Sequence, residues 1–260
     1  MSGVRRLWVL LTALHRYPKS FSTRGQGDDT LIDAPILAYL LETANGRLLV
    51  DVGCDYHKVA DAAARARWFE QPGNVLGAPK MTDEQRISTY LARLGLDAAD
   101  VDAVILTHLH FDHAGGLGEV AHADVHLHAL ELAAAEEHAD PYYFAGEISP
   151  RPNWRAHPES FSPVPGVTAI ETPGHTRGHL SVFVELEQGR PILLAGDAAD
   201  LTENLEHEIA PGLCYRDDPE PALASIRELK ALAAREGAEL WPNHDIEFFR
   251  RAKRFPESYG

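Results

Sequence analysis

The strongest constraint on the fold is a buried strand that ends in a cluster of metal-binding residue types. The segment Val101–Leu106 is almost wholly apolar, which is typical of a strand covered on both faces. The chain then reads THLHFDHAGG from Thr107 to Gly116. His108 and His110 point to the same side of an extended chain, because side chains repeat every two residues. Asp112 and His113 follow where the chain turns toward a predicted helix, so four potential ligands gather at one strand end.

Three more potential ligands each follow a predicted strand. His175 comes after the strand Val167–Glu171, Asp197 after Ile192–Ala195, and His244 after Glu239–Trp241. Loops that leave strand ends gather at one edge of a sheet and build sites there. Imidazole and carboxylate ligands without cysteine suit zinc, and also iron, manganese or cobalt. The sequence therefore predicts a metal site assembled from distant segments.

Short apolar runs alternate with helical patterns along the chain, which predicts an α/β domain with helices covering sheets. Further strands are predicted at Leu7–Leu14, Leu37–Leu41, Arg47–Val52 and Val182–Leu186, with Asn45-Gly46 as a hairpin turn. Helices are predicted at Asp55–Trp68, Asp83–Leu94, Ala129–His138 and Pro221–Arg235. We expect one domain over residues 1–260, in which the Pro-rich, aromatic stretch from about Pro141 to Pro165 forms a lid or substrate loop.

Composition excludes several classes of function. The formal net charge of −15 would repel a nucleic acid and an anionic membrane surface alike, so neither partner is expected. Cys54 and Cys214 provide neither a disulfide framework nor a four-thiolate zinc site. Arg5 and Arg6 precede an apolar run, but no small-residue cleavage pattern follows it and the run is too short to span a bilayer. A first β-strand and a cytoplasmic location are the expectations.

The motifs resemble those of the metallo-β-lactamase superfamily and, within it, of the N-acyl-homoserine lactonase family. The resemblance covers nearly the whole chain. It is carried by the segments Tyr39–Thr43, Leu49–Gly53, Pro79–Thr82, Thr107–Gly116, Thr172–Thr176, Leu201–Asn204, Pro221–Ile226 and Asn243–Glu247. This resemblance implies an αββα sandwich that carries two divalent metal ions, zinc being preferred, and a small-molecule lactone as substrate. It allows a homodimer as readily as a monomer.

The resemblance also implies a role for each matched residue. His108, His110 and His175 would hold one ion, whereas Asp112, His113 and His244 would hold the other, with Asp197 bridging both. Asp51 and His179 match positions that orient ligands. A hydroxide held between the ions would attack the lactone carbonyl, and Asp112 would pass a proton to the leaving oxygen.

Substrate contacts are expected from aromatic side chains. Phe111 lies inside the central motif and is predicted to line the substrate pocket. Tyr142, Tyr143, Phe144 and Trp154 are predicted to wall an acyl groove. No serine or cysteine nucleophile is required.

One departure from the lactonase pattern keeps other substrates open. These lactonases commonly carry a tyrosine three residues after the bridging aspartate, whereas this chain has Asp200, and an ionised carboxylate cannot donate a hydrogen bond. The alternatives are an enzyme for another small lactone or ester and a glyoxalase II-like thioesterase, although the chain after His244 is too short for the helical domain of the latter. A redox di-iron protein, which would have glutamate where this chain has His110, and a non-catalytic binding protein complete the alternatives.

Overall fold

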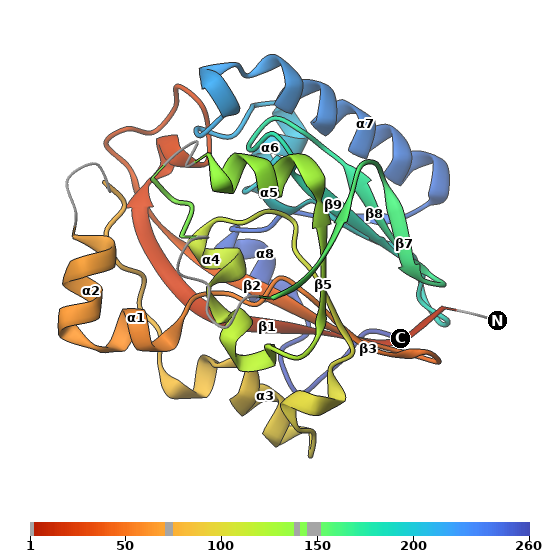
Figure 1. Ribbon diagram of the computed structural model, residues 1–260. Helices are drawn as coiled ribbons and strands as arrows, with labels where there is room; N and C mark the ends of the chain where they lie inside the picture. The colour runs from red at the N-terminus through yellow and green to blue at the C-terminus, as the bar shows by residue number, and fades with distance from the viewer. Residues whose placement is uncertain (1–2, 71–74, 138–140, 145–151) are drawn as a thin grey trace.

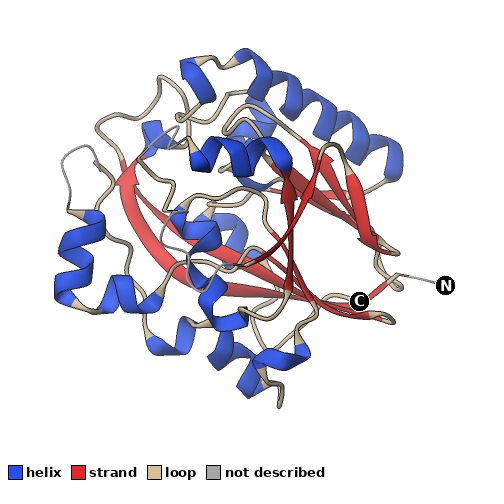
Figure 2. Ribbon diagram, viewed as in Figure 1, coloured by secondary structure: helices blue, strands red, loops and turns tan. Residues whose placement is uncertain are grey.

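Two β-sheets lie face to face between two layers of helices (Figure 1 and Figure 2). The computed structural model describes residues 3–70, 75–137, 141–144 and 152–260. The first sheet has six strands in the order β1-β2-β3-β4-β5-β6, and the second has five in the order β11-β10-β9-β8-β7. The strands are β1 (Val4–Pro18), β2 (Leu31–Thr43), β3 (Gly46–Val50), β4 (Ala103–Ile105), β5 (Asp124–His128), β6 (Asn153–His157), β7 (Phe161–Val164), β8 (Val167–Glu171), β9 (Leu180–Val184), β10 (Ile192–Leu194) and β11 (Glu239–Trp241).

Alternating side chains explain why each sheet is apolar on both faces. In β3, Leu48 and Val50 belong to the core between the two sheets, whereas Leu49 belongs to the core beneath the outer helices. In β10, Leu194 joins the inner core and Leu193 packs beneath the helices on the opposite side. Because consecutive side chains of a strand point to opposite faces, a continuous apolar run suits a strand buried on both sides.

The helices cover the two outer faces of the pair of sheets (Figure 2). They are α1 (Tyr56–Ala60), α2 (Ala62–Phe69), α3 (Ile87–Arg93), α4 (Phe111–Ala114), α5 (Ala129–Glu136), α6 (Thr202–His207), α7 (Glu220–Glu236) and α8 (Ile246–Arg251). Ile226 and Leu229 of α7 pack on the second sheet, while Ile87 and Leu91 of α3 pack on the first. Among the residues that the structure describes, no helix has both the length and the apolar character to cross a membrane.

The predicted strands are present, and two of them have the expected bounds. The segments Val167–Glu171 and Glu239–Trp241 form β8 and β11. The first apolar run lies inside β1, and Asn45-Gly46 forms the turn between the antiparallel strands β2 and β3. Strands β3 to β6 run parallel to one another. Their carboxyl ends therefore meet at one edge, where the central motif begins.

Two predicted helices are interrupted. The segment Asp55–Trp68 divides into α1 and α2 because Asp61 is extended and its side chain accepts from the Ala64 amide to begin a new helix. The segment Asp83–Leu94 divides at Arg86, which is also extended, so that only α3 is α-helical and the first turn is a 3-10 helix. Arg86 is held there by the Glu119 carboxylate, 3.1 Å from its Nε. A local helix cap therefore divides the first segment, and a contact with a distant residue divides the second.

The stretch from about Pro141 to Pro165, predicted to be irregular, contains two strands. Asn153–His157 forms β6 at the edge of the first sheet, and Phe161–Val164 forms β7 at the edge of the second. Residues 145–151 of this stretch and His138, the predicted end of the helix over α5, lie outside the described residues. The function of the stretch as a lid or substrate loop stays a prediction.

Candidate metal centre

The seven predicted ligands converge at one edge of the two sheets. Six of them are buried, and Asp112 is partly buried. From the first sheet come His108 and His110, on the loop after β4, and Asp112 and His113 on α4. From the second sheet come His175 between β8 and β9, Asp197 after β10 and His244 after β11. Residues far apart in the sequence thus meet because they all follow strands that end at this edge.

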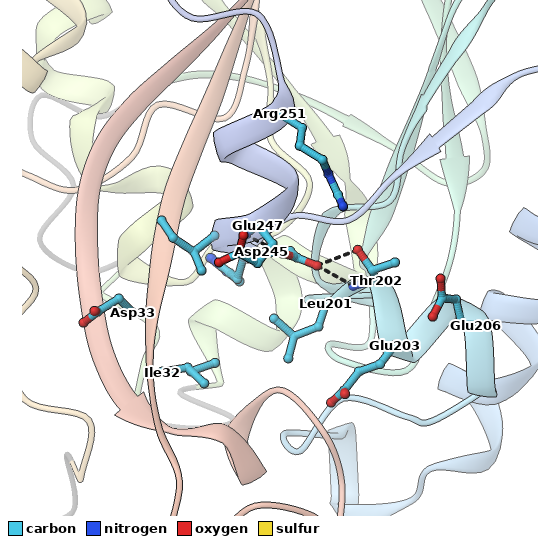
Figure 3. A pocket seen from close by; sticks show the side chains of 11 residues that line it. Ile32, Asp33, Leu201, Thr202, Glu203, Glu206, Asp245, Glu247 and Arg251 are labelled. Carbon is cyan, nitrogen blue, oxygen red and sulfur yellow. Dashed lines mark hydrogen bonds between the residues drawn. The ribbon is translucent and has the colours of Figure 1, made fainter.

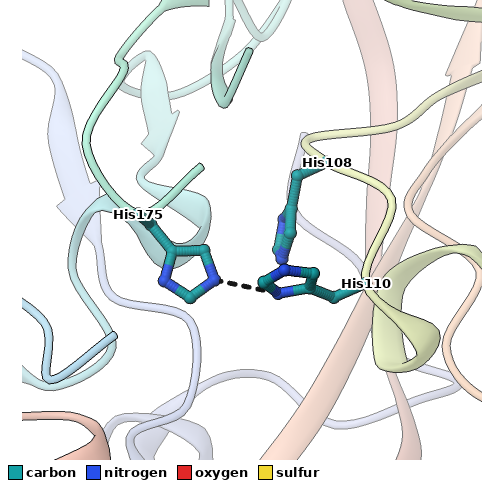
Figure 4. Close-up of side chains that lie close together, drawn as sticks. All are labelled: His108, His110 and His175. Carbon is teal, nitrogen blue, oxygen red and sulfur yellow. Dashed lines mark hydrogen bonds between the residues drawn. The ribbon is translucent and has the colours of Figure 1, made fainter. Parts of the chain in front are cut away.

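The side chains form two groups of three. The ligand atoms of His108, His110 and His175 lie within 4.8 Å of one another, and Figure 4 shows the three rings turned toward a common point. His175 Nε2 is 3.1 Å from His110 Nδ1. A second group with the same spacing consists of Asp112, His113 and His244. We call these groups the first triad and the second triad.

Asp197 lies between the triads and presents one carboxylate oxygen to each. Its Oδ2 is 3.4 Å from His175 Nε2 and 3.7 Å from His108 Nε2. Its Oδ1 is 3.3 Å from His113 Nε2 and 3.2 Å from His244 Nε2. A carboxylate in this position can bridge two cations, one in each triad.

The donor atoms fit divalent metal ions. Nε2 of His108 and Nε2 of His113 are buried and make no hydrogen bond with any described residue. The opposite ring nitrogens of three ligands lie beside oxygen acceptors: His113 Nδ1 is 2.8 Å from Asp51, His244 Nδ1 is 2.9 Å from the Pro35 carbonyl, and His175 Nδ1 is 3.0 Å from the Leu213 carbonyl. Such partners fix the tautomer in which Nε2 is the ring nitrogen that offers a lone pair to a metal ion.

Both residues predicted to orient ligands contact one. Asp51 accepts hydrogen bonds from the Thr107 amide and hydroxyl at 2.8 Å each, in addition to its contact with His113. His179 Nε2 accepts from the Asp197 amide at 2.9 Å. Burial lowers the pKa of His179 to about 3, so this ring is neutral and can accept.

The electrostatics of the cluster keep Asp197 ionised. Burial by itself would raise the pKa of Asp197, but the neighbouring imidazoles of His113, His244 and His108 hold it well below its ordinary value. Burial likewise opposes the charged form of His244, whereas Asp197 and the other carboxylates raise its pKa to about 10. An ionised carboxylate among imidazoles is the donor set expected for a site of two divalent ions such as zinc, iron or manganese.

A narrow pocket of about 30 Å³ opens above the ligands. Its other side is lined by His15, Tyr17, Phe21, Leu76, Phe111, Tyr142 and Leu213. Phe144 stacks on Phe111 with 5.2 Å between ring centroids, and Phe69 meets Phe111 edge-on at 5.2 Å. We call Phe69, Phe111, Tyr142 and Phe144 the aromatic wall.

The aromatic residues predicted to wall an acyl groove divide into two sets. Tyr142 lines the pocket and Phe144 stacks on Phe111, while an acyl groove there stays a prediction. Tyr143 instead packs in the core beneath the outer helices, on the opposite side of the chain from its two neighbours, and Trp154 lies on β6 against that same core.

Sequence reasoning missed two pocket residues on β1. His15 and Tyr17 share one face of the strand and reach the pocket, with the Tyr17 hydroxyl 3.1 Å from Ser22 Oγ. The available signal was their i, i+2 spacing at the end of an apolar strand. His15 Nε2 lies 3.1 Å from the carbonyl oxygens of Leu76 and Gly77.

Asp200 occupies the wall of the pocket near the second triad. Its carboxyl group is buried, and its Oδ1 has no hydrogen-bond partner among the described residues. Burial, reinforced by the charge of Asp197, raises the pKa of Asp200 to about 8. In the metal-free protein Asp200 is therefore mostly protonated at neutral pH and can donate, while two bound divalent cations would oppose that shift.

His244 also lines a second, open hollow of about 360 Å³. Figure 3 shows this hollow with Asp245 and Thr202 beside it. There Asp245 accepts from the Thr202 amide at 2.9 Å and from the amides of Glu247 and Phe248 at 2.8 and 2.9 Å. The Asp245 carboxylate thus caps α8 and joins it to the start of α6. This cap holds the backbone on which His244 stands.

Comparison with known proteins agrees with the geometry of the site. The model of the metallo-beta-lactamase superfamily matches residues 31–244, which include all seven predicted ligands. The chain belongs to the metallo-beta-lactamase superfamily. Within the superfamily it belongs with the N-acyl homoserine lactonases, since it is 39% identical over 227 residues to such an enzyme of a Bacillus species, covering 87% of this chain and 88% of the relative.

Solved structures extend the likeness over nearly the whole chain. A structure of N-acyl homoserine lactone hydrolase, with the product N-hexanoyl-L-homoserine bound at its catalytic metal centre, matches with a TM-score of 0.87 and 33% identity, covering 99% of this chain and all of that one. A variant of AiiA from Bacillus thuringiensis with N-decanoyl-L-homoserine at its active site matches with a TM-score of 0.88, 33% identity and the same coverage. The expected αββα fold is confirmed.

Proposed function

We propose that this protein hydrolyses the lactone ring of N-acyl homoserine lactones at a centre of two divalent metal ions. The observation that carries the proposal is the position of Asp197, whose two oxygens face the two triads at 3.2 to 3.7 Å. Its relatives are hydrolases that open this ring, and two of their structures hold the ring-opened products hexanoyl- and decanoyl-homoserine.

The first triad would hold one ion, the second triad the other, and Asp197 would bridge them. When bound, two such ions lower the pKa of a shared water toward neutrality and polarise an ester carbonyl. We expect zinc because imidazole and carboxylate donors without thiolates suit it, with iron, cobalt or manganese as alternatives. A homodimer stays a prediction.

Asp112 is the residue that we expect to move the proton. Its carboxylate is the most exposed of the seven ligand groups, with a side chain 15% exposed, and it lines the pocket. Its Oδ2 lies 3.8 Å from His113 Nε2 and 3.9 Å from His244 Nε2. From there it can take the proton released when water adds to the carbonyl and deliver it to the ring oxygen that leaves.

The aromatic wall is the part that we expect to receive the acyl chain. Phe111 lies on α4 between two predicted ligands and lines the pocket, so we expect its ring to contact a substrate held at the ions. The apolar part of the lining suits an acyl tail, and the described residues that line the pocket include no lysine or arginine for a glutathione carboxylate, which disfavours a glyoxalase II-like thioesterase. Another small lactone stays an alternative, because Asp200 stands where related lactonases commonly have a tyrosine.

The decisive experiment is hydrolysis across a panel of esters by the metal-loaded protein. The panel contains short- and long-chain acyl-homoserine lactones, simple γ- and δ-lactones and a thioester, with acid release followed by pH-stat and the ring-opened product by mass spectrometry. We expect acyl-homoserine lactones to be cleaved fastest, no activity after chelation, and recovery when zinc is returned. Preferential cleavage of a simple lactone or of the thioester would replace this substrate assignment, and full activity in the chelated protein would refute the metal mechanism.

A further inference from the structure

Glu131 is a fully buried carboxylate that the proposed reaction does not use. It lies in the first turn of α5 and is 0% exposed, although the rest of that helix consists mainly of alanine and leucine. A buried carboxylate is costly unless hydrogen bonds satisfy both of its oxygens. Its position therefore needs a structural or functional reason.

Four donors converge on this carboxylate, two on each oxygen. Oε1 accepts from the Leu109 amide at 2.9 Å and from the Tyr143 hydroxyl at 3.0 Å. Oε2 accepts from the Thr176 hydroxyl at 2.7 Å and from the Gly178 amide at 3.2 Å. An ionised glutamate is an acceptor only, and this arrangement satisfies it fully.

Three of the four donors adjoin the first triad, and the fourth, Gly178, lies three residues after His175 on the same loop. Leu109 stands between His108 and His110, and Thr176 directly follows His175. The Tyr143 ring packs edge-on against the His110 ring at 4.8 Å. None of the four donors is next in sequence to a member of the second triad.

Close packing at Gly178 independently shows that the loop of His175 is seated on α5. A Cβ atom at position 178 would lie 2.2 Å from the Glu131 amide nitrogen and 2.7 Å from its Cα. Any larger residue there would push the loop away from the helix. The contact therefore depends on glycine on one side and on the glutamate carboxylate on the other.

We infer that Glu131 is a positioning residue that sets the affinity of the first triad for its ion, by tying the loop of His108 and His110 to the loop of His175. The inference rests on the proposed two-metal centre. Asp51 lies differently, because it contacts His113 of the second triad directly and also accepts from Thr107, whose hydroxyl is 3.1 Å from His108 Nδ1. Glu131 contacts only residues around the first triad among the hydrogen bonds given above.

The test is Glu131→Gln, which keeps the shape of the side chain. The substitution replaces one acceptor oxygen by an NH2 group, which would face two hydrogen-bond donors that it cannot accept from. We expect affinity for one ion to fall by about 10-fold or more, as for loss of an outer-shell partner, and affinity for the other to stay unchanged. Metal content per chain is measured at graded, chelator-buffered zinc concentrations. The affected ion is identified in the cobalt-loaded protein by its absorption bands. His110→Ala marks the bands of the first triad and His244→Ala those of the second. Glu131→Gln should lose the bands that His110→Ala loses and keep those that His244→Ala loses.

Two further variants keep the inference falsifiable. Glu119→Gln is the matched control. The Glu119 carboxylate also accepts from a backbone amide, that of Ser88 at 2.8 Å, and from Arg86 at 3.1 Å, but it contacts no predicted ligand among the described residues. The Glu119→Gln protein should bind both ions normally. Tyr143→Phe removes one donor without leaving a bare charge and should weaken the same ion by a smaller factor. It decides the question if Glu131→Gln does not fold.

Equal loss of both ions, or normal binding of both in Glu131→Gln and Tyr143→Phe, would overturn the inference. These measurements need no lactone. If the ions bind as described and no lactone is opened, only the proposed function fails, whereas a protein that binds no ions refutes both proposals.

Discussion

The two sides of the pocket are held in place by different kinds of interaction. On the metal side, the ligands His113, His175 and His244 each have a second ring nitrogen fixed against an oxygen 2.8 to 3.0 Å away. On the aromatic wall, Phe111 and its neighbours touch through ring packing at centroid distances of about 5 Å. Hydrogen bonds are directional and tolerate little displacement, whereas apolar packing tolerates exchange of similar side chains.

The difference teaches that the chemistry and the choice of substrate are separable in this protein. Substitutions on the metal side should destroy turnover of every substrate to the same extent. Substitutions on the aromatic wall should instead change which acyl chain is preferred. The first two variants below test this division, beginning with the larger expected effect on turnover, and the third tests the environment of Asp200 on the metal side.

Asp197→Ala should abolish hydrolysis of all lactones. It removes a carboxylate that faces both triads, so both ions should bind weakly. Loss of a residue that only supports a ligand can cost about 100-fold, and loss of the bridging carboxylate should lower activity further. Metal analysis and initial rates are measured on the same preparation. Asp28→Ala, at an exposed aspartate, is the control and should match the natural protein in both. Retention of two ions and of activity by Asp197→Ala would show that Asp197 is not the residue that holds the centre together.

Phe111→Ala should raise KM for a decanoyl substrate roughly tenfold, because about 1.4 kcal/mol of apolar contact is lost. The effect on a butanoyl substrate and on kcat should be much smaller, since the short chain makes less contact with the wall. Steady-state kinetics with both substrates measure the change, and Phe111→Leu, which keeps an apolar side chain, should lie between the two proteins. A large fall in kcat with unchanged chain-length preference would break the division between the two sides.

Asp200→Asn should produce a pH-dependent change in the stability of the metal-free protein. The pKa of Asp200 in the folded protein is about 8, above the ordinary 3.8, so the folded state binds more protons than the unfolded state between those values. The free energy of unfolding therefore falls as pH rises from about 4 to about 8 and changes no further above that. Asparagine stays neutral, so the variant should gain in melting temperature relative to the natural protein at pH 8 and not at pH 4. A parallel pH dependence in both proteins would contradict this account of Asp200.

The fold and the ligands could be predicted largely because their signals are local. Buried strands such as Val101–Leu106 show as short apolar runs, and the ligands follow them within a few residues. Asp51 and His179 were also found, through the matched family motifs, and both contact a ligand in the structure.

The remaining features depend on contacts between distant segments. The break at Arg86 needs Glu119, and the burial of Glu131 needs donors on three loops. Tyr17 reaches the pocket only because β1 extends along β2 to Pro18, which pairs with Leu31. No pattern within a short window of the sequence contains such information, so these features require the structure.

The position of the metal centre at the junction of the sheets also has a mechanical consequence. Each triad takes two residues from the segment that follows β4 of the six-stranded sheet and one from a loop of the five-stranded sheet. A cation bound in either triad would therefore cross-link the two halves of the sandwich. Metal loading should stiffen the whole molecule against proteolysis, because opening a gap between the halves would first have to pull an ion off its ligands.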